Sequence, residues 1–351
     1  MADSDNPDFV SLGMFIIDEF SFSDENNAPT GKTLPRIGGG GTYATIGARI
    51  WLPPHKVGMI VDRGNDFPQD IQDKLLSYGS EIWHFRDHHD RGTTRALNSY
   101  RGDFRGSQHV FRSKFPIPEP NVFQYLTDRI RLTPTDLRGT RLARPTTLHF
   151  ICSPTRALDI ISEAEAVDRP IMIFEPIPDK CIPEELEPLK KALPSISVLS
   201  PNADEALALL SITSLVTRET VEHAAAQFLG MGVSENGTGA VVIRSGALGA
   251  YVATRERGGK WIDAFWTHSN SKVVDVTGAG NSFLGGLAAG LVLADRDIYE
   301  AAFYASVSAS FAIEQGGLPS LTVRPESGVE EWNVDVPQRR LDALRQHQLA
   351  N

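Results

Sequence analysis

An α/β fold built around a mostly parallel sheet is predicted from three features of the sequence. From residue 145 onward, short apolar segments alternate with segments of helical length and pattern. An earlier apolar segment, residues 9–17, has the size of a buried strand. The chain has 351 residues, of which 41% are hydrophobic, which suffices for one large domain or two medium ones. Alternation at this spacing is typical of a parallel sheet covered by helices on both faces.

The expected elements can be placed along the chain. The first strand, 9–17, is expected to end at Asp18, and Thr42 to cap the first helix. Further strands are expected at 56–61, 147–152, 171–174, 197–199 and 240–244, with edge strands at 249–254 and 260–265. Helices are expected at 42–51, 68–78, 155–167, 183–192, 202–211, 218–230, 280–294 and 297–315, followed by an amphipathic segment at 339–347.

Residues 91–118 differ in kind from the rest of the chain. They are rich in Arg, Gly, Ser and aromatic residues and lack a helical stripe. Short alternating pieces at 93–100 and 108–111 predict a small exposed sheet or flap. Its basic residues could reach a phosphorylated substrate, and a solvated flap explains them equally well. These residues are Arg91, Arg95, Arg101, Arg105 and Arg112.

Charge and composition exclude several classes of function. The formal net charge of −10 argues against a nucleic-acid or anionic-membrane surface, although backbone amides can still bind an anion locally. Cys152 and Cys181 have no metal-type spacing and indicate buried thiols in a reducing compartment. No apolar run approaches the length of a membrane span, and the acidic start resembles no secretory signal. A cytoplasmic protein is expected.

A histidine cluster offers a metal site as one interpretation. His84, His88 and His89 lie close together in the sequence. Their spacing fits no zinc template and no matching cysteines occur, so a solvated loop is favoured.

The segment 273–286 carries the strongest indication of chemistry. It reads as a strand end, a turn of small residues at Gly278, Ala279 and Gly280, and the start of a helix. Backbone amides at such a turn converge where the helix dipole is positive, which favours binding of a transferring phosphoryl group. A tight strand-to-helix connection with glycines for packing is the alternative for an isolated turn of this kind.

This segment resembles the second signature of the ribokinase (PfkB) family of carbohydrate kinases, which reads D-T-x-G-A-G-D. The resemblance implies that residues 278–280 form the anion hole and that the base which deprotonates the sugar hydroxyl falls on Asn281. Asp275 takes the place of the first aspartate and Val276 departs from the usual Thr or Pro. Asp275 and Thr277 are implied to lie beside the nucleotide.

Other blocks of the family occur in the same order, from about residue 9 to 317. The resemblance implies that Asp18, Gly39, Gly40 and Asp66 contact the substrate, with the glycine segment also hinging the lid. It implies that Asn202, Glu205, Ser245, Gly246 and Ser308 serve the nucleotide, with Glu205 organising magnesium through water. Taken alone, Asp18 fits a strand-end turn, and Asn202 with Glu205 fits a helix N-terminus.

The implied architecture is a ribokinase-like three-layer sandwich with a mostly parallel central sheet and a small β lid. It divides the chain into a disordered start at 1–8, a domain at 9–324 with lid segments near 19–37 and 91–118, and an extension at 325–351 with a terminal helix. ATP and Mg²⁺ are the implied cofactors and a sugar or nucleoside-like alcohol the implied substrate. A homodimer formed through the lid stays open.

Asparagine at position 281 changes the expected mechanism. It can accept a hydrogen bond from a hydroxyl but cannot take its proton, and general-base assistance is worth about 10²–10⁴-fold. Three explanations compete: a kinase that borrows Asp18, Asp66 or a substrate phosphate as its base; a nucleotide- or sugar-binding pseudokinase; and a site turned to another reaction. The GGGGTYA and TGAGNSF segments resemble a maintenance-of-killer type of PfkB-like protein.

An unrelated dinucleotide-dependent oxidoreductase is a different class with a similar alternating pattern. It would show G-x-G-x-x-G after the first strand, with an acidic residue about 20 positions further on. The first strand here runs to Asp18 without such a loop, so this class is disfavoured.

Overall fold

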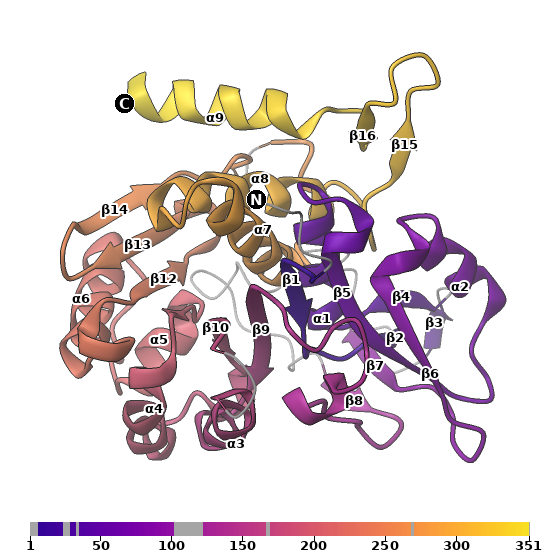
Figure 1. Ribbon diagram of the computed structural model, residues 1–351, viewed down its shortest axis with the longest axis horizontal. Helices are drawn as coiled ribbons and strands as arrows, with labels where there is room; N and C mark the ends of the chain where they lie inside the picture. Colours follow the sequence, from indigo (N-terminus) through magenta and orange to yellow (C-terminus); the bar gives the residue numbers. More distant parts are fainter. Residues whose placement is uncertain are drawn as a thin grey trace.

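The computed structural model describes residues 6–23, 29–32, 35–101, 122–165, 169–267 and 270–350. A nine-stranded sheet forms its centre, and helices cover both faces (Figure 1). In spatial order the strands are β14 (Gly258–Ile262), β13 (Ala250–Thr254), β12 (Ala240–Arg244), β11 (Val198–Leu199), β10 (Ile171–Pro176), β9 (Thr147–Cys152), β1 (Phe9–Ser11), β5 (Val57–Arg63) and β6 (Trp83–Asp87). The strands from β6 to β12 pair in parallel, whereas β13 and β14 form an antiparallel edge. The predicted three-layer α/β fold is confirmed.

Two apolar cores lie on opposite faces of the sheet because side chains alternate along each strand. Phe9 belongs to one core and its neighbour Val10 to the other. The first core is covered by α1 (Gly40–Arg49), α2 (Gln69–Leu76), α7 (Ala279–Leu293) and α8 (Ile298–Ala312). The second core is covered by α3 (Pro154–Glu165), α4 (Leu186–Ala192), α5 (Ala203–Leu209) and α6 (Arg218–Met231).

The expected first strand is divided in two. Its start is β1 in the central sheet, and its end belongs to β2 (Ile16–Ser23) in a second sheet. The chain turns between them because Gly13 contacts the first turn of α1: a Cβ at Gly13 would lie 2.5 Å from the amide nitrogen of Gly41. The prediction that the strand ends at Asp18 is therefore wrong, and Asp18 lies inside β2.

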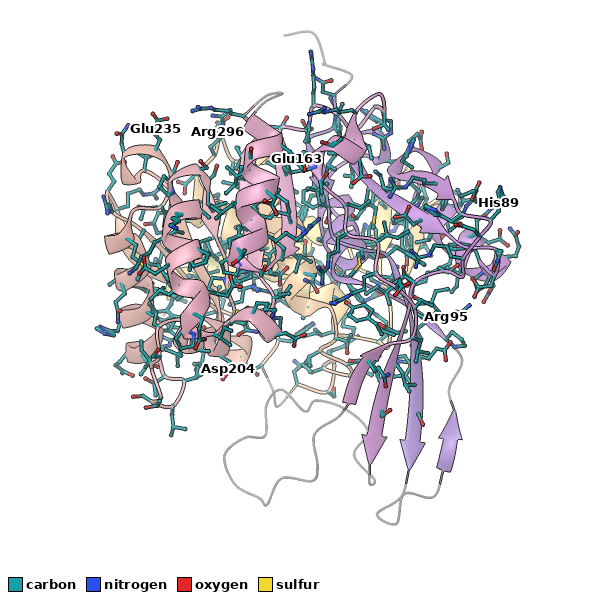
Figure 2. All side chains as sticks on the ribbon, turned by 90° about the horizontal axis from the view of Figure 1, so that it is seen from below. His89, Arg95, Glu163, Asp204, Glu235 and Arg296 are labelled. Atoms are coloured by element: carbon teal, nitrogen blue, oxygen red, sulfur yellow. The ribbon has the colours of Figure 1, made fainter. Side chains whose placement is uncertain are left out.

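A second sheet is formed largely by the segments predicted to form a lid, and its role as a lid stays a prediction. It contains β2, β3 (Pro29–Lys32), β4 (Arg36–Gly38), β7 (Arg95–Arg101) and β8 (Val122–Tyr125). Its strands extend away from the body of the molecule, and Arg95 lies where β7 leaves it (Figure 2). The expected strand at 93–100 corresponds to β7, while the piece at 108–111 lies outside the described residues, as do Arg105 and Arg112.

The start of α1 differs from expectation. Gly39, with a φ of 90°, precedes α1 as its N-cap, and Thr42 lies inside the helix with its hydroxyl buried and unbonded. The prediction that Thr42 caps this helix is wrong, because the glycine run lets the helix begin two residues earlier.

The end of the chain packs on the body. β15 (Leu321–Val323) and β16 (Glu330–Trp332) form a small hairpin, and α9 (Pro337–Ala350) follows it along the outer side of α8 (Figure 1). Trp332, Leu341 and Leu344 belong to the first core. Within the described residues, no helix combines the length and apolarity needed to cross a membrane.

Close packing of α7 on α1 depends on Gly285. A Cβ at this position would lie 1.7 Å from the carbonyl oxygen of Ala44, so we expect Gly285→Ala to lower the free energy of unfolding by about 1–3 kcal/mol. Gly230→Ala is the matched control, because this helical glycine of α6 has open space where a Cβ would stand and should gain about 0.5–1 kcal/mol. Urea unfolding of both variants measures the difference; equal effects would contradict the packing argument.

Candidate active site

The turn before α7 has the geometry of an exposed helix start. Gly278 is the N-cap with a φ of 76°, and no side chain caps the helix. The Ala279 amide donates to the Val276 carbonyl at 3.2 Å, so it is used within the turn. The anion-binding role therefore stays a prediction for the amides of Gly278 and Gly280.

Both glycines of this turn are in contact with side chains from other elements. A Cβ at Gly278 would lie 2.2 Å from the ring of Tyr43 in α1, and one at Gly280 would lie 2.4 Å from Nη1 of Arg244 at the end of β12. Only glycine fits these two positions without displacing a neighbour. The guanidinium of Arg244 consequently lies against the helix start.

Asp275 shapes the entry to the turn. Its Oδ1 accepts a hydrogen bond from the amide of Thr277 at 2.9 Å, and its Oδ2 lies 3.7 Å from Nη1 of Arg36. The amides of Val274 and Asp275 donate to the carbonyl of Ile313, just after α8. The turn is thus fixed to the end of α8 through the backbone.

Asn281, in the first turn of α7, is held by a carboxylate. Its Nδ2 donates to Oε2 of Glu175 at 2.8 Å. Gly40 lies against the same amide, since a Cβ there would stand 3.0 Å from Nδ2. The structure therefore brings the predicted base position and the predicted glycine segment into contact.

Glu175 is the centre of a buried polar network. Its side chain is 7% exposed, its Oε1 lies 2.7 Å from Nη1 of Arg244, and its Oε2 lies 3.3 Å from Nε2 of His149. The hydroxyl of Ser11 bonds to the other nitrogen of His149 at 3.0 Å. Burial alone would raise the pKa of Glu175, but Arg244, His149 and Asn281 outweigh it and lower that pKa below its usual value.

Asn202 and Glu205 form a capping box at the start of α5. The side chain of Asn202 accepts from the amide of Glu205 at 2.8 Å, and the Glu205 carboxylate accepts from the amide of Asn202 at 2.7 Å. Burial raises the pKa of Glu205 to about 7, against the opposing effect of Arg244. The helix-capping interpretation is confirmed, and the magnesium role stays a prediction.

Asp18 is a buried carboxyl beside the glycine segment. A Cβ at Gly38 would stand 1.9 Å from its Oδ2, so only glycine allows this approach. Burial raises the pKa of Asp18 to about 7; a hydrogen bond from Asn98 opposes this shift and the nearby Asp275 adds to it. Gly39 approaches the carbonyl of Met14 in the same way.

Asp66 ties the lid to the central sheet. Its Oδ1 accepts from the amide of Thr93 at 2.7 Å and its Oδ2 from Nη2 of Arg95 at 2.8 Å. These hydrogen bonds outweigh burial and lower the pKa of Asp66. Arg95 also lies 3.1 Å from Glu19 of β2. The carboxylate of Asp66 thus has partners in the base of the lid.

Comparisons with known proteins identify the family. An uncharacterised protein of Schizosaccharomyces pombe is 33% identical over 96% of this chain and 92% of its own length, and Protein MAK32 of Saccharomyces cerevisiae is 32% identical over 92% and 88%. The model of the pfkB family carbohydrate kinases matches residues 152–322. The chain belongs to the pfkB family. Within it, the chain lies in a divergent, maintenance-of-killer-like branch with these two relatives.

Solved structures of a ribokinase and a putative ribokinase share the fold. The ribokinase of Giardia lamblia superimposes with a TM-score of 0.68 at 17% identity, over 89% of this chain and 96% of that one. A putative ribokinase II of E. coli in complex with ATP and Mg²⁺ superimposes with a TM-score of 0.65 at 17% identity, over 97% and 99%. Identities this low establish the architecture alone.

Three residues that the resemblance assigns to the nucleotide make contacts within the protein. Ser308 is fully buried, and its hydroxyl donates to the carbonyl of Gly47 at 2.9 Å and accepts from Nε1 of Trp51 at 2.8 Å. Its hydroxyl thus joins α8 to α1, and its assignment to the nucleotide stays a prediction. Ser245 and Gly246 follow β12 in the turn that begins beside Arg244, and the Ser245 amide donates to Gly249.

The histidines do not gather into a metal site. Nε2 of His88 bonds to Oδ1 of Asp62 at 2.7 Å, and His84 belongs to β6. In the described part of the chain, no group of three or more His, Cys, Asp or Glu residues has the geometry to hold a metal ion.

The pattern-based analysis missed Glu175, Arg244 and His149. Glu175 and Arg244 each stand at the carboxyl end of an apolar strand, where open α/β sheets bind their ligands. The position of both residues at strand ends is the signal in the sequence that marks them. His149 stands mid-strand and carries no such signal.

The raised pKa of Asp18 predicts a pH effect on stability. Because the folded-state pKa of about 7 exceeds the usual value of 3.8, the folded state binds the extra proton, and the free energy of unfolding should fall between pH 4 and pH 7. Asp18→Asn should flatten this fall and exceed the wild type in stability at pH 8. Urea unfolding at pH 5 and pH 8 measures it, with the exposed Asp70→Asn as control. An unchanged fall in Asp18→Asn would contradict the assignment.

Proposed function

We propose that this pfkB-family protein binds ATP with Mg²⁺ and transfers a phosphoryl group, slowly, to an alcohol of a sugar or nucleoside-like substrate. The observation that carries the proposal is the contact of Asn281 with Gly40, which joins the helix start suited to phosphate with the glycine segment beside Asp18. The slow rate follows from the amide at position 281, which orients a hydroxyl without removing its proton.

The residues at this site fit a nucleotide and a divalent cation. The glycines at 278 and 280 allow the ring of Tyr43 and the guanidinium of Arg244 to pack against the turn. A helix N-terminus beside a guanidinium attracts phosphate. Glu205 offers carboxylate oxygens, the hard ligands that Mg²⁺ prefers. The cation would neutralise charge on the phosphates when bound. Glu205 would hold it through water, because both carboxylate oxygens already accept hydrogen bonds from Asn202.

Asp18 is the better of the two carboxyl groups suggested as a borrowed base. Asp66 is engaged by Thr93 and Arg95, and its pKa is lowered, so it is a poor proton acceptor. The pKa of Asp18 is raised to about 7 by burial, near the value that favours general-base catalysis at neutral pH. Asp18 would thus both position the alcohol and accept its proton.

A nucleotide-binding pseudokinase is the second candidate. The hydrogen bond between Asn281 and Glu175 favours it, because Glu175 accepts a hydrogen bond from the asparagine amide that an ionised aspartate could not donate. The two candidates agree on binding and differ in turnover.

Titration with ATP and Mg²⁺ by calorimetry tests binding, and coupled ADP release over a panel of sugars and nucleosides tests transfer. Saturable ATP binding with turnover about 10²–10⁴-fold below ordinary kinase rates would support the proposal. Binding without any turnover would favour the pseudokinase. Absence of ATP binding would overturn both, and turnover at ordinary kinase rates would overturn the impaired transfer.

A further inference from the structure

A buried ion pair lies directly behind Asn281. Glu175 and Arg244 are 7% and 10% exposed and 2.7 Å apart. Arg244 also donates to the carbonyl of Ser200 at 3.0 Å and lies 3.6 Å from Glu205. The pair therefore connects the ends of β10 and β12 with the starts of α5 and α7. Such pairs lose much of their attraction to desolvation, so their presence at a ligand-binding edge calls for a role in the site.

The chemistry of the contact fixes the orientation of the Asn281 amide. An ionised carboxylate only accepts hydrogen bonds, so the amide must turn its NH₂ group toward Glu175, as the 2.8 Å contact shows. The carbonyl oxygen then receives no hydrogen bond from the described residues. It is left as the free acceptor at the position where the resemblance expects a base.

An aspartate at position 281 does not suit this environment. Its carboxylate would stand within hydrogen-bond distance of Glu175, replacing a donor–acceptor contact by two like charges. Two carboxylates this close cannot both ionise, and one must hold a proton. The asparagine is thus matched to the buried carboxylate of Glu175.

We infer that Glu175 is a positioning residue that holds Asn281 as a hydroxyl-orienting acceptor, and that residues 175 and 281 form one interdependent pair. In this pair, residue 175 carries the carboxylate and residue 281 the amide. Exchanging only one of the two side chains removes the donor–acceptor match. The role in orienting a substrate hydroxyl rests on the proposed function, whereas the pairing itself does not.

A double-mutant cycle tests the pairing in the full-length protein. The four proteins are wild type, Asn281→Asp, Glu175→Gln and the double variant, which keeps the total charge and reverses the direction of the hydrogen bond. We expect each single variant to lower the equilibrium constant of folding at least about tenfold. The double variant should still lack the ion pair between Glu175 and Arg244, but its folding constant should exceed the product of the two single effects by about tenfold. Glu187→Gln, which removes an exposed carboxylate bonded to Lys190, is the control for the exchange itself. Multiplicative effects of the two single exchanges would overturn the inference.

Activity provides a readout that a merely structural pair would not move. With ATP, Mg²⁺ and D-ribose as the probe, ADP formation by Asn281→Asp should be no faster than by wild type, whereas the double variant should be about 10–100-fold faster. The affinity for ATP should differ little between them. If Asn281→Asp alone matched the double variant, the inference would be wrong.

The two proposals fail in different ways. If none of the four proteins bound ATP while the folding equilibria still showed coupling, the proposed function would fall and the pairing would stand. If all four bound ATP and their folding equilibria showed no coupling, the pairing would fall alone.

Discussion

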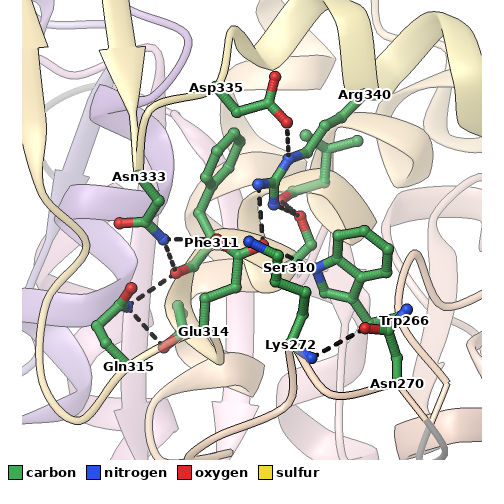
Figure 3. A network of polar contacts seen from close by, with 12 residues as sticks. Trp266, Asn270, Lys272, Ser310, Phe311, Glu314, Gln315, Asn333, Asp335 and Arg340 are labelled. Carbon is green, nitrogen blue, oxygen red and sulfur yellow. Dashed lines mark hydrogen bonds and ion pairs between the residues drawn. The ribbon is translucent and has the colours of Figure 1, made fainter.

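Replacing Arg340 by alanine is expected to lower the free energy of unfolding by about 3–5 kcal/mol. Arg340 is 4% exposed and holds Asp335 and Glu314 at 2.8 and 2.9 Å, the latter itself 5% exposed. Its Nη1 donates to the hydroxyl of Ser310, and its guanidinium lies 3.7 Å from the centre of the Phe311 ring. Figure 3 shows these contacts converging between α9 and α8. Alanine would leave Glu314 charged, buried and without its guanidinium partner.

Arg339 supplies the matched control. It precedes Arg340 in α9 and pairs with the same Asp335, but its side chain is 74% exposed, so Arg339→Ala should cost no more than about 1 kcal/mol. The apolar replacement of both partners, Arg340→Met with Glu314→Met, should recover much of the loss, because it leaves no unpaired charge. Urea unfolding monitored by tryptophan fluorescence measures all variants. Equal effects of Arg339→Ala and Arg340→Ala would contradict the burial argument.

We also expect Arg340→Ala to disturb the backbone contacts that hold the candidate active site. Glu314 follows Ile313, whose carbonyl accepts from the amides of Val274 and Asp275 just before the turn.

The terminal segment was expected as an extension beyond the domain, with an amphipathic helix. The helix could be predicted from the sequence pattern. Its attachment to the core through Arg340 could not, because an arginine in a helix is ordinarily exposed to solvent. Only the tertiary contact with Glu314 and Phe311 makes it part of the core.

The layered fold could be predicted because alternation of strands and helices is a local property of the sequence. The division of the first strand could not be predicted in this way. It depends on the contact between Gly13 and Gly41, which are far apart in the sequence. Thr42 was misjudged for a related reason: a hydroxyl near a helix start resembles a cap, yet the glycines before it extend the helix.

Site residues could be predicted where a local sequence motif marks them. They could not be predicted where only a tertiary contact brings them together. The turn at Gly278 and the capping box of Asn202 were found from local sequence. Glu175 and Arg244 come from different strands, and no short-range pattern joins them. Ser308 was predicted to lie in a helix, but its contact with the carbonyl of Gly47 in α1 could not be predicted, because it joins residues far apart in the chain.

Substituting Gly278 by alanine is expected to reduce ATP affinity by about tenfold or more. Two separate effects combine at this position. The left-handed backbone, with a φ of 76°, costs a non-glycine residue about 1–2 kcal/mol. The added Cβ would also stand 2.2 Å from the Tyr43 ring, so either the ring or the turn must move. A displaced turn no longer presents its amides together. For comparison, the loss of one oriented donor from an oxyanion hole costs about 2.7–4 kcal/mol of transition-state stabilisation.

Gly258→Ala separates these effects. Gly258, at the start of β14, has a φ of 74°, and a Cβ there would meet nothing within 4 Å. Both variants should therefore lose similar stability through the backbone, while only Gly278→Ala should lose ATP binding. Calorimetric titration with ATP and Mg²⁺, together with urea unfolding, distinguishes the two losses. Full ATP affinity in Gly278→Ala would show that the phosphates do not lie at this turn, because the contact with Tyr43 leaves no room for the substituted turn to keep its geometry.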